Sequence, residues 1–580
     1  MNNQHVFRRL LGYLKKYRLR LCMVLVFAGI STIFMVLAPF VIGEITTTLF
    51  ASIQDGRFYW KTIGTLLLIL IGLYFISQIF SLLQGFGMAK ITAGVMETLR
   101  QDIDDKMHRL KLEYYDTHTH GDILSVITND VDTINNTMSQ NLTAIVTQAV
   151  TAAGIFLMMV SISPKLSVIP IILVPLSLLS AAKMMKLSGT YYNRQQQLLG
   201  TLNGYIEEIY HGHQVVQTFH YQKRAQAAFE ELNEQLCQSA FKAETTAGAV
   251  TPITTVVNDV GYVLCAGLGC IGAIAGRIAI GNVQAMLEYT RKFAEPFSSI
   301  AGMAGSFGAA AAAGKRIFAL LDAEEEIPES NHCVIPQNCK GSVSFQNVAF
   351  GYTPDSLLMK GIDVTIKPGQ KVAIVGPTGA GKTTIVNLIS RFYDIEDGKI
   401  LVDGYDLTKV SIESLRRQMG VMTQDNFIFH GTVRDNILYG KLDATDEEMI
   451  AAAKAVNAHD FIMKMEKGYD TELKEHGAGL SIGQRQLIAF ARTMISMPKI
   501  LILDEATSSI DTHTELLVQQ GIEALLSGRT SFVIAHRLST IQNADRIFVI
   551  DKGGILEQGS PAELMEKKGA YYKLYMAQFA

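Results

Sequence analysis

Residues 376–383, Gly-Pro-Thr-Gly-Ala-Gly-Lys-Thr, have the types and spacing of a loop that binds phosphate. They follow the short apolar run Val372–Val375 and precede a helical run, which is the context that such a loop requires. Its glycines let backbone N–H groups surround the phosphates. We expect Lys382 to reach the β- and γ-phosphates of ATP, and Thr383 to ligate Mg²⁺. The residues expected to bind the nucleotide are Gly376, Pro377, Thr378, Gly379, Ala380, Gly381, Lys382, Thr383 and Thr384.

A second chemical element follows the apolar run Lys499–Leu503, which ends in Asp504 and Glu505. An uninterrupted apolar run suits a central parallel strand, and such strands deliver their ligands at their carboxyl ends. We expect Asp504 to hold the Mg²⁺ shell, and Glu505 to orient and activate the attacking water. Together with the phosphate loop, this pair predicts hydrolysis of ATP.

The first half of the chain is built differently. Of the 580 residues, 48% are hydrophobic, and the longest apolar runs lie within residues 1–320. Runs long enough to cross about 30 Å of hydrocarbon predict six spans. They lie near 20–46, 61–86, 141–162, 165–183, 246–275 and 281–312. Polar connectors at helical spacing after the second and fourth spans indicate helices that continue into the cytoplasm.

Six crossings return the chain to the side on which it began. The basic residues Arg8, Arg9, Lys15, Lys16, Arg18 and Arg20 resemble a cytoplasmic anchor rather than a cleavable signal peptide. We therefore expect a multi-pass protein of the cytoplasmic membrane with both termini in the cytoplasm.

Composition argues against several other functions. A formal net charge of −3 provides no basic field, so nucleic acid is not expected as a partner. The six cysteines lack CxxC spacing, and a Cys333–Cys339 disulfide is disfavoured beside a nucleotide site of the reducing cytosol. The histidine pairs His118/His120 and His211/His213 leave a metal site open, but solvated side chains are favoured because no local carboxylate or cysteine completes a ligand set.

The predicted sixth span contains four charged residues spaced along one helical face before Pro296, namely Glu288, Arg291, Lys292 and Glu295. Glu44 and Asp259 lie in the first and fifth predicted spans. Charges at membrane depth normally face a bundle interior or a water-filled path. Two interpretations stay open: these six residues line a polar transport path, or those of the sixth span are solvated near its outer end.

With these motifs in view, residues 341–580 resemble the nucleotide-binding domain of an ABC transporter, and the whole chain resembles an exporter-type half-transporter. The resemblance implies a multi-domain chain: an all-α, six-helix transmembrane domain (1–325), a linker (326–340) and an α/β P-loop ABC ATPase domain (341–580).

The resemblance also assigns roles to single residues. Tyr352 matches the aromatic that stacks on adenine, Gln424 the glutamine that senses Mg²⁺ and water, and His536 the histidine that holds the γ-phosphate; residues 508–511 match the loop that crosses the dimer interface. Tyr114–Ser125 with Thr128–Val131, and Gly212–Phe219, resemble the two segments that transmit motion between ATP sites and spans.

One motif departs from the family. Each ATP in the family is completed by a Leu-Ser-Gly-Gly-Gln signature from the partner chain, whereas this chain has Leu480, Ser481, Ile482, Gly483 and Gln484. Lys474 and His476 also stand where the family usually has Gly and Arg. An altered signature beside an intact Glu505 resembles exporters built from two different chains. A heterodimer with one competent ATP site is favoured, and a homodimer that tolerates isoleucine is the alternative.

The expected function is ATP-driven export of an amphipathic or hydrophobic compound, including multidrug, lipid or peptide cargo. A lipid translocase, an importer on the same fold and a non-transporting ATP-gated regulator are the alternatives. Retention of Glu505 argues against the regulator.

Overall fold

The computed structural model describes residues 3–326, 339–352, 357–423, 426–504, 512–534 and 541–579. The chain divides into two compact units. Unit 1 comprises Met1–His108 and Thr119–Ala323, and unit 2 comprises Arg109–His118 and Glu324–Ala580. The short segment Arg109–His118 therefore belongs with the C-terminal unit, although the chain runs into unit 1 on both sides of it.

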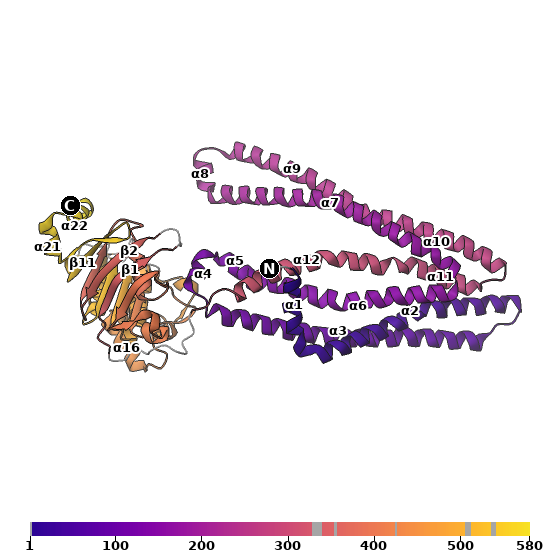
Figure 1. Ribbon diagram of the computed structural model, residues 1–580, viewed down its shortest axis with the longest axis horizontal. Helices are drawn as coiled ribbons and strands as arrows, with labels where there is room; N and C mark the ends of the chain where they lie inside the picture. Colours follow the sequence, from indigo (N-terminus) through magenta and orange to yellow (C-terminus); the bar gives the residue numbers. More distant parts are fainter. Residues whose placement is uncertain are drawn as a thin grey trace. The chain divides into compact units, whose positions relative to one another are not determined.

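Helices make up the described part of unit 1 (Figure 1). They are α1 (Asn3–Leu14), α2 (Arg18–Gln54), α3 (Trp60–Met107), α5 (His120–Ser125), α6 (Val131–Ile162), α7 (Pro164–His211), α8 (His213–Thr218), α9 (Gln222–Gly248), α10 (Val250–Ile274), α11 (Ile280–Phe293) and α12 (Glu295–Leu321). Helix α2 packs against α3, α6 and α11, and α7 packs against α9 and α10. Long helices of this kind bury an apolar core that includes Ile155, Met159, Met286 and Tyr289.

Among the described residues, five helical stretches are long and apolar enough to cross a membrane: Asn3–Gln54, Trp60–Met107, His120–Ile162, Pro164–His211 and Gln222–Ile274. The sixth predicted span is not among them. It forms two consecutive helices, α11 and α12, which meet at Ala294 directly before Glu295 and Pro296. Proline at the second position of α12 is compatible with a helix start but not with a continuous hydrogen-bond ladder.

The strands described in unit 2 form three sheets. A six-stranded sheet has the order β12 (Gly554–Gly559), β11 (Arg546–Asp551), β3 (Lys371–Val375), β10 (Thr530–Ile534), β9 (Ile500–Asp504) and β6 (Met419–Met422). Its strands are parallel except for β12, which is antiparallel to β11. An antiparallel sheet has the order β2 (Met359–Ile366), β1 (Val343–Phe350), β4 (Asp397–Val402) and β5 (Tyr405–Asp406). Strands β7 (Gly431–Thr432) and β8 (Glu472–Leu473) form a small third sheet.

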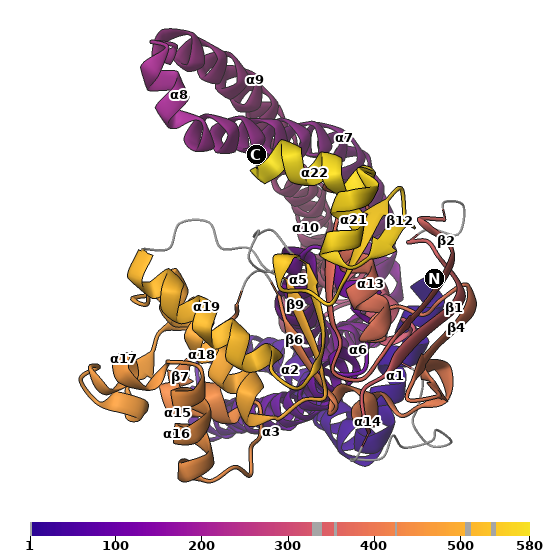
Figure 2. The same cartoon turned by 90° about the vertical axis from the view of Figure 1, so that its left-hand side faces the viewer.

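Helices cover these sheets. The described ones are α4 (Leu112–Thr117), α13 (Lys382–Ile389), α14 (Ile412–Arg416), α15 (Val433–Leu438), α16 (Asp446–Ala455), α17 (His459–Met463), α18 (Ile482–Ile495), α19 (Thr512–Leu526), α21 (Pro561–Lys567) and α22 (Ala570–Phe579). Figure 2 shows α15 to α19 gathered on one side of unit 2, and β1, β2 and β4 on the other. Strands β3, β9 and β10 are buried almost throughout, which accounts for their nearly uninterrupted apolar sequences.

Candidate functional site

The register of three parallel strands brings the two chemical motifs to one edge of the six-stranded sheet. Ile534 at the end of β10 pairs with Ile374 of β3 on one side and with Asp504 of β9 on the other. Asp504 therefore lies level with the end of β3, two strand spacings away, which is roughly 10 Å. The phosphate loop begins directly after β3, so its residues and Asp504 share the carboxyl edge, where parallel sheets place their ligands.

Glycine is required at several positions of the loop. Gly379 has φ 81° and Gly381 has φ 98°, the left-handed region that residues with a Cβ rarely adopt. Gly381 is the residue directly before α13. At Gly376 an added Cβ would lie 2.2 Å from the carbonyl oxygen of Ile550. The loop is therefore a backbone cradle that larger side chains would fill.

Lys382 is folded over this cradle. Its Nζ donates hydrogen bonds to the carbonyl oxygens of Gly376 (2.9 Å) and Pro377 (3.0 Å). Burial lowers the pKa of the Lys382 ammonium, and the negative charge of Asp504 opposes that shift. Its two hydrogen-bond acceptors in the loop are neutral carbonyl groups, so the ammonium keeps a positive charge that can attract an anion. The cradle and this lysine fit a polyphosphate, and the oxygens of Thr383 and Asp504 are ligands of the kind that Mg²⁺ prefers.

An aromatic side chain lies beside the loop. The hydroxyl groups of Tyr352 and Thr384 are 3.0 Å apart, and Thr384 is buried in the first turn of α13. Tyr352 is 46% exposed as a residue, and its ring meets Phe350 and Tyr393 edge-on, at centroid distances of 5.0 and 5.1 Å. Tyr352 is therefore held next to the phosphate loop with part of its ring uncovered, as stacking on a base requires.

Three predicted residues lie outside the described part of the chain: Gln424, Glu505 and His536. The predicted interface loop 508–511 lies outside it as well. Their roles stay predictions. Glu505 comes directly after Asp504, the last residue of β9, and His536 comes shortly after Ile534, the last residue of β10. Both strands end at the carboxyl edge of the sheet.

The altered signature starts helix α18. Ser481 caps the helix: its Oγ accepts from the Gln484 amide (3.2 Å), and Gln484 Oε1 accepts from the Ser481 amide (3.0 Å). Ile482 occupies the first helical position and is 40% exposed, with no positive φ. A left-handed backbone occurs upstream of the helix, at His476, with φ 55° and ψ 19°. Isoleucine is thus compatible with the backbone, and it adds an exposed apolar side chain at the N-terminus of α18.

Helix α18 is tied to the segment that follows Gln424. Arg492 donates from Nη1 to the carbonyl oxygen of Phe427 (2.9 Å), and from Nε and Nη2 to the backbone and side-chain oxygens of Asn436 (2.8 and 2.9 Å). Its guanidinium also lies over the rings of Phe429 and Tyr439. Arg492 therefore links the segment after Gln424 to the signature helix, in addition to the packing of α15 against α18.

The six charged residues of the predicted substrate path are distributed over four helices. Glu288 and Lys292 form an ion pair of 3.9 Å on α11, and Arg291 is exposed on the same helix. Glu295 belongs to the first turn of α12, so the four charges of this segment do not lie on one continuous helix. Glu44 is half-buried on α2, and Asp259 is exposed on α10. Their role in transport stays a prediction.

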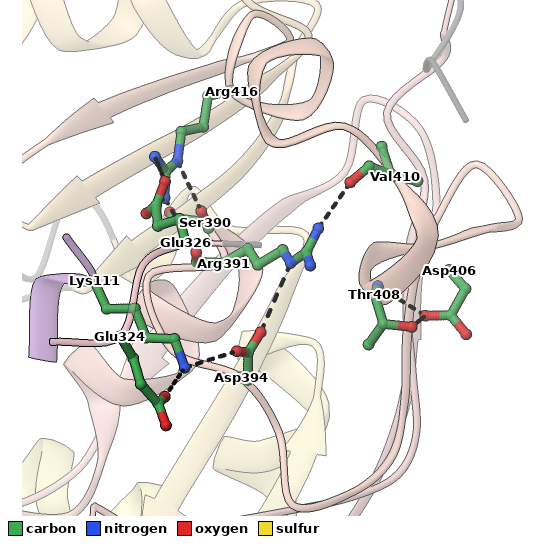
Figure 3. A network of polar contacts seen from close by, with 10 residues as sticks. All are labelled: Lys111, Glu324, Glu326, Ser390, Arg391, Asp394, Asp406, Thr408, Val410 and Arg416. Carbon is green, nitrogen blue, oxygen red and sulfur yellow. Dashed lines mark hydrogen bonds and ion pairs between the residues drawn. The ribbon is translucent and has the colours of Figure 1, made fainter. Parts of the chain in front are cut away.

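Sequence reasoning missed a polar network that joins Arg109–His118 and Glu324–Glu326 to the rest of unit 2 (Figure 3). Leu110 forms an antiparallel bridge with Glu325. The three successive glutamates pair with Lys111 (2.9 Å), Arg109 (3.7 Å) and Arg416 (2.9 Å), respectively. The acidic run Glu324–Glu326 was a visible signal, but nothing in the sequence identified its partners.

Comparisons with known proteins agree with this architecture. The family described as ABC transporter transmembrane region matches residues 21–297, and the family described as ABC transporter matches residues 359–508. The uncharacterized ABC transporter ATP-binding protein YfiC of Bacillus subtilis is 39% identical over 575 residues, which cover 99% of this chain and 94% of that protein.

Two other relatives have descriptive names. A fatty acid ABC transporter ATP-binding/permease protein of Mycobacterium tuberculosis is 42% identical over 83% of this chain and 76% of its own length. An ATP-dependent lipid A-core flippase of Syntrophus aciditrophicus is 33% identical over 99% and 94% of the two chains. Among solved structures, a bacterial Atm1-family ABC exporter with ATP bound has a TM-score of 0.76 and 28% identity over 100% of this chain and 99% of that one.

These matches confirm the predicted fold class, a helical transmembrane domain followed by an α/β ATPase domain. They also confirm that the chain binds and hydrolyses ATP, because the ATPase family and the full-length relatives both match it. The chain therefore belongs to the ABC transporter family, as a membrane-spanning ATPase of the exporter type with its transmembrane region and nucleotide-binding domain on one polypeptide.

Proposed function

We propose that this chain exports an amphipathic or lipid-like compound across the cytoplasmic membrane as one half of a heterodimer with a single fully competent ATP site. The observation that carries this proposal is the contrast between the two ATP-binding surfaces. The phosphate loop with Asp504 fits nucleotide and metal, whereas the signature at the start of α18 has an exposed Ile482 in place of glycine.

In the competent site, this chain contributes Lys382 to the β- and γ-phosphates and Tyr352 to the adenine. Thr383, Asp504 and Gln424 would hold Mg²⁺, which when bound neutralises charge that develops on the phosphate oxygens. Glu505 accepts a proton from the water that attacks the γ-phosphorus, while the bond to the β,γ-bridging oxygen breaks. His536 positions that water and the γ-phosphate. The second chain supplies an intact signature.

Replacement of the proposed base tests this mechanism. Glu505→Gln keeps the size of the side chain but removes the proton acceptor, so ATP is expected to bind with little change while turnover falls by at least 100-fold, the lower range for a general base. Turnover and equilibrium nucleotide binding are measured on the same preparation. Full turnover in Glu505→Gln contradicts the assignment.

The assembly is tested by intact mass and ATPase rate. The chain is purified alone, and then after co-expression with a half-transporter encoded beside it. A chain that is inactive alone and active in a mixed dimer supports the heterodimer. Brisk turnover by two identical chains supports the alternative, in which Ile482 is tolerated and both sites hydrolyse ATP. Absence of turnover in either assembly supports a non-transporting regulator.

The lipid-like substrate class is supported by the named fatty acid transporter and lipid A-core flippase among the relatives. The test is ATPase stimulation in nanodiscs. Fatty acids, phospholipids of different headgroups and a cationic amphipathic drug are compared at concentrations that place equal amounts of each compound in the nanodisc membrane. Headgroup-dependent stimulation favours a lipid translocase, whereas stimulation by the drug alone favours multidrug export. Accumulation of the stimulating compound inside intact cells, rather than its loss, indicates import.

A further inference from the structure

Tyr393 connects the aromatic side chain of the ATP site to segment 109–118. Its ring meets Tyr352 edge-on at 5.1 Å and Phe350 at 5.8 Å. Its hydroxyl donates a hydrogen bond to the Asp116 carboxylate of α4. Burial raises the pKa of Tyr393, and the hydrogen bond to Asp116 raises it further, so the phenol stays protonated at physiological pH and remains a donor.

Asp394, the residue after Tyr393, contacts the same segment near its start, at Lys111. Asp394 lies 3.9 Å from Nζ of Lys111 and 3.8 Å from Nε of Arg391. Figure 3 shows Lys111 between the carboxylates of Asp394 and Glu324. Two consecutive residues of unit 2 therefore seat the segment near its start, at Lys111, and near its end, at Asp116.

Tyr352 has room to change position relative to Tyr393. A cavity of about 190 Å³ adjoins both rings, and Glu113 of α4 contributes to its lining. In this structure the Tyr352 hydroxyl is engaged with Thr384 of α13 rather than with a base. Stacking on adenine would place a new group against a ring that Tyr393 already contacts, and Tyr393 cannot shift without pulling on Asp116.

We propose that Tyr393 is a positioning residue that reports the state of Tyr352 to segment 109–118, through its edge contact with Tyr352 and its hydrogen bond to Asp116. This inference rests on the proposed function, in which Tyr352 stacks on adenine. Glu505 and His536, which are proposed to act in hydrolysis, are not part of this link between Tyr352 and Asp116. Loss of the Tyr393 hydroxyl therefore separates nucleotide binding from the response of the membrane domain, without removing a group that touches ATP.

The fluorescence of a tryptophan in the chain can report the response of the membrane domain. Trp60 is its only tryptophan, and it is the first residue of α3. The last residue of α3, Met107, lies just before segment 109–118, and a helix of that length spans ~70 Å. Trp60 is 73% exposed and its ring lies 4.2 Å from that of Phe58, so its fluorescence is sensitive to local rearrangement.

The experiment uses the full assembly in lipid nanodiscs, with any tryptophan of a second chain replaced by phenylalanine. A non-hydrolysable ATP analogue is titrated while nucleotide binding and Trp60 fluorescence are recorded separately. Tyr393→Phe keeps the ring and removes the hydroxyl, and Asp116→Asn removes the acceptor charge. Tyr405→Phe, on β5, is the matched control. We expect half-saturation by nucleotide within two-fold of wild type in all variants, and a fluorescence amplitude reduced at least three-fold in Tyr393→Phe and Asp116→Asn only.

The double variant is expected to respond like either single variant, because both remove the same hydrogen bond. An unchanged amplitude in both single variants overturns the inference, as does an additive loss in the double variant. A shift of nucleotide half-saturation beyond two-fold in Tyr393→Phe also overturns it, because that result indicates a structural role in the binding site. Failure of the proposed function gives a different result: the wild type then binds nucleotide without a fluorescence response, and Tyr352→Ala leaves the half-saturation by nucleotide unchanged.

Discussion

Lys382 illustrates how far single residues could be interpreted from sequence. The loop 376–383 is contiguous, so its composition identifies it, and the structure adds that Lys382 rests on two carbonyl oxygens. Tyr393 shows what could not be predicted from the sequence. Nothing in its local sequence indicates that its hydroxyl meets Asp116, because that contact depends on the fold of residues far apart in the chain.

Lys382→Ala is expected to weaken nucleotide binding itself. The substitution removes a cation from the ground-state complex, so the dissociation constant for ATP should rise at least ten-fold, about 1.4 kcal/mol. Titration of a fluorescent ATP analogue measures this change. Lys399→Ala, an exposed lysine on β4, is the control and should leave binding unchanged. Equal affinity of Lys382→Ala and wild type contradicts the assignment of this residue to the phosphates.

Ile482 is the residue whose replacement distinguishes the proposed heterodimer from the alternative homodimer. In the proposed heterodimer it faces a site whose other residues do not support hydrolysis, so Ile482→Gly should change ATP turnover by less than two-fold. In a homodimer the same substitution restores the family's glycine at both sites and should raise turnover several-fold. ATPase rates at saturating ATP distinguish the two, with Ala478→Gly, an exposed neighbour, as the control.

At the scale of elements, periodicity located the apolar helices but not the way they pack. Gly43 of α2 and Gly281 of α11 meet so closely that a Cβ on Gly281 would lie 1.7 Å from the Gly43 carbonyl oxygen. The Gly281 amide also donates to Thr47 Oγ1 at 3.2 Å. Each glycine looks ordinary in its own apolar run, because the requirement for a missing side chain comes from the partner helix.

Gly281→Ala should therefore destabilise unit 1. Forcing a methyl group into a closely packed contact typically costs about 1–3 kcal/mol, so we expect a lower midpoint of thermal unfolding in detergent. Gly302→Ala is the matched control: it lies within α12 with no atom near its added Cβ, and replacing a helical glycine there should be neutral or stabilising by about 0.5–1 kcal/mol. If the midpoint of thermal unfolding of Gly281→Ala is no lower than that of Gly302→Ala, α2 and α11 can move apart at this point without a loss of stability, and the prediction is wrong.

At the scale of the whole molecule, the number of crossings decides on which side ATP is used. In the part of the chain that the structure describes, five helical stretches satisfy the length and hydropathy of a span, and α11 with α12 is the sixth predicted crossing. If α11 and α12 cross together, the even number places the N-terminus and the ATPase unit on the same side. If they do not, the odd number separates them.

We expect six crossings, because the basic N-terminal residues and an ATPase both belong in the cytoplasm. In inverted membrane vesicles, externally added ATP should be hydrolysed and an N-terminal tag should be cleaved by external protease. In intact cells the tag should be protected. A tag protected in vesicles that hydrolyse external ATP would show an odd number of crossings. The charges Glu288 and Lys292 would then lie at a membrane surface instead of along a transport path, because the helix that carries them would not pass through the hydrocarbon.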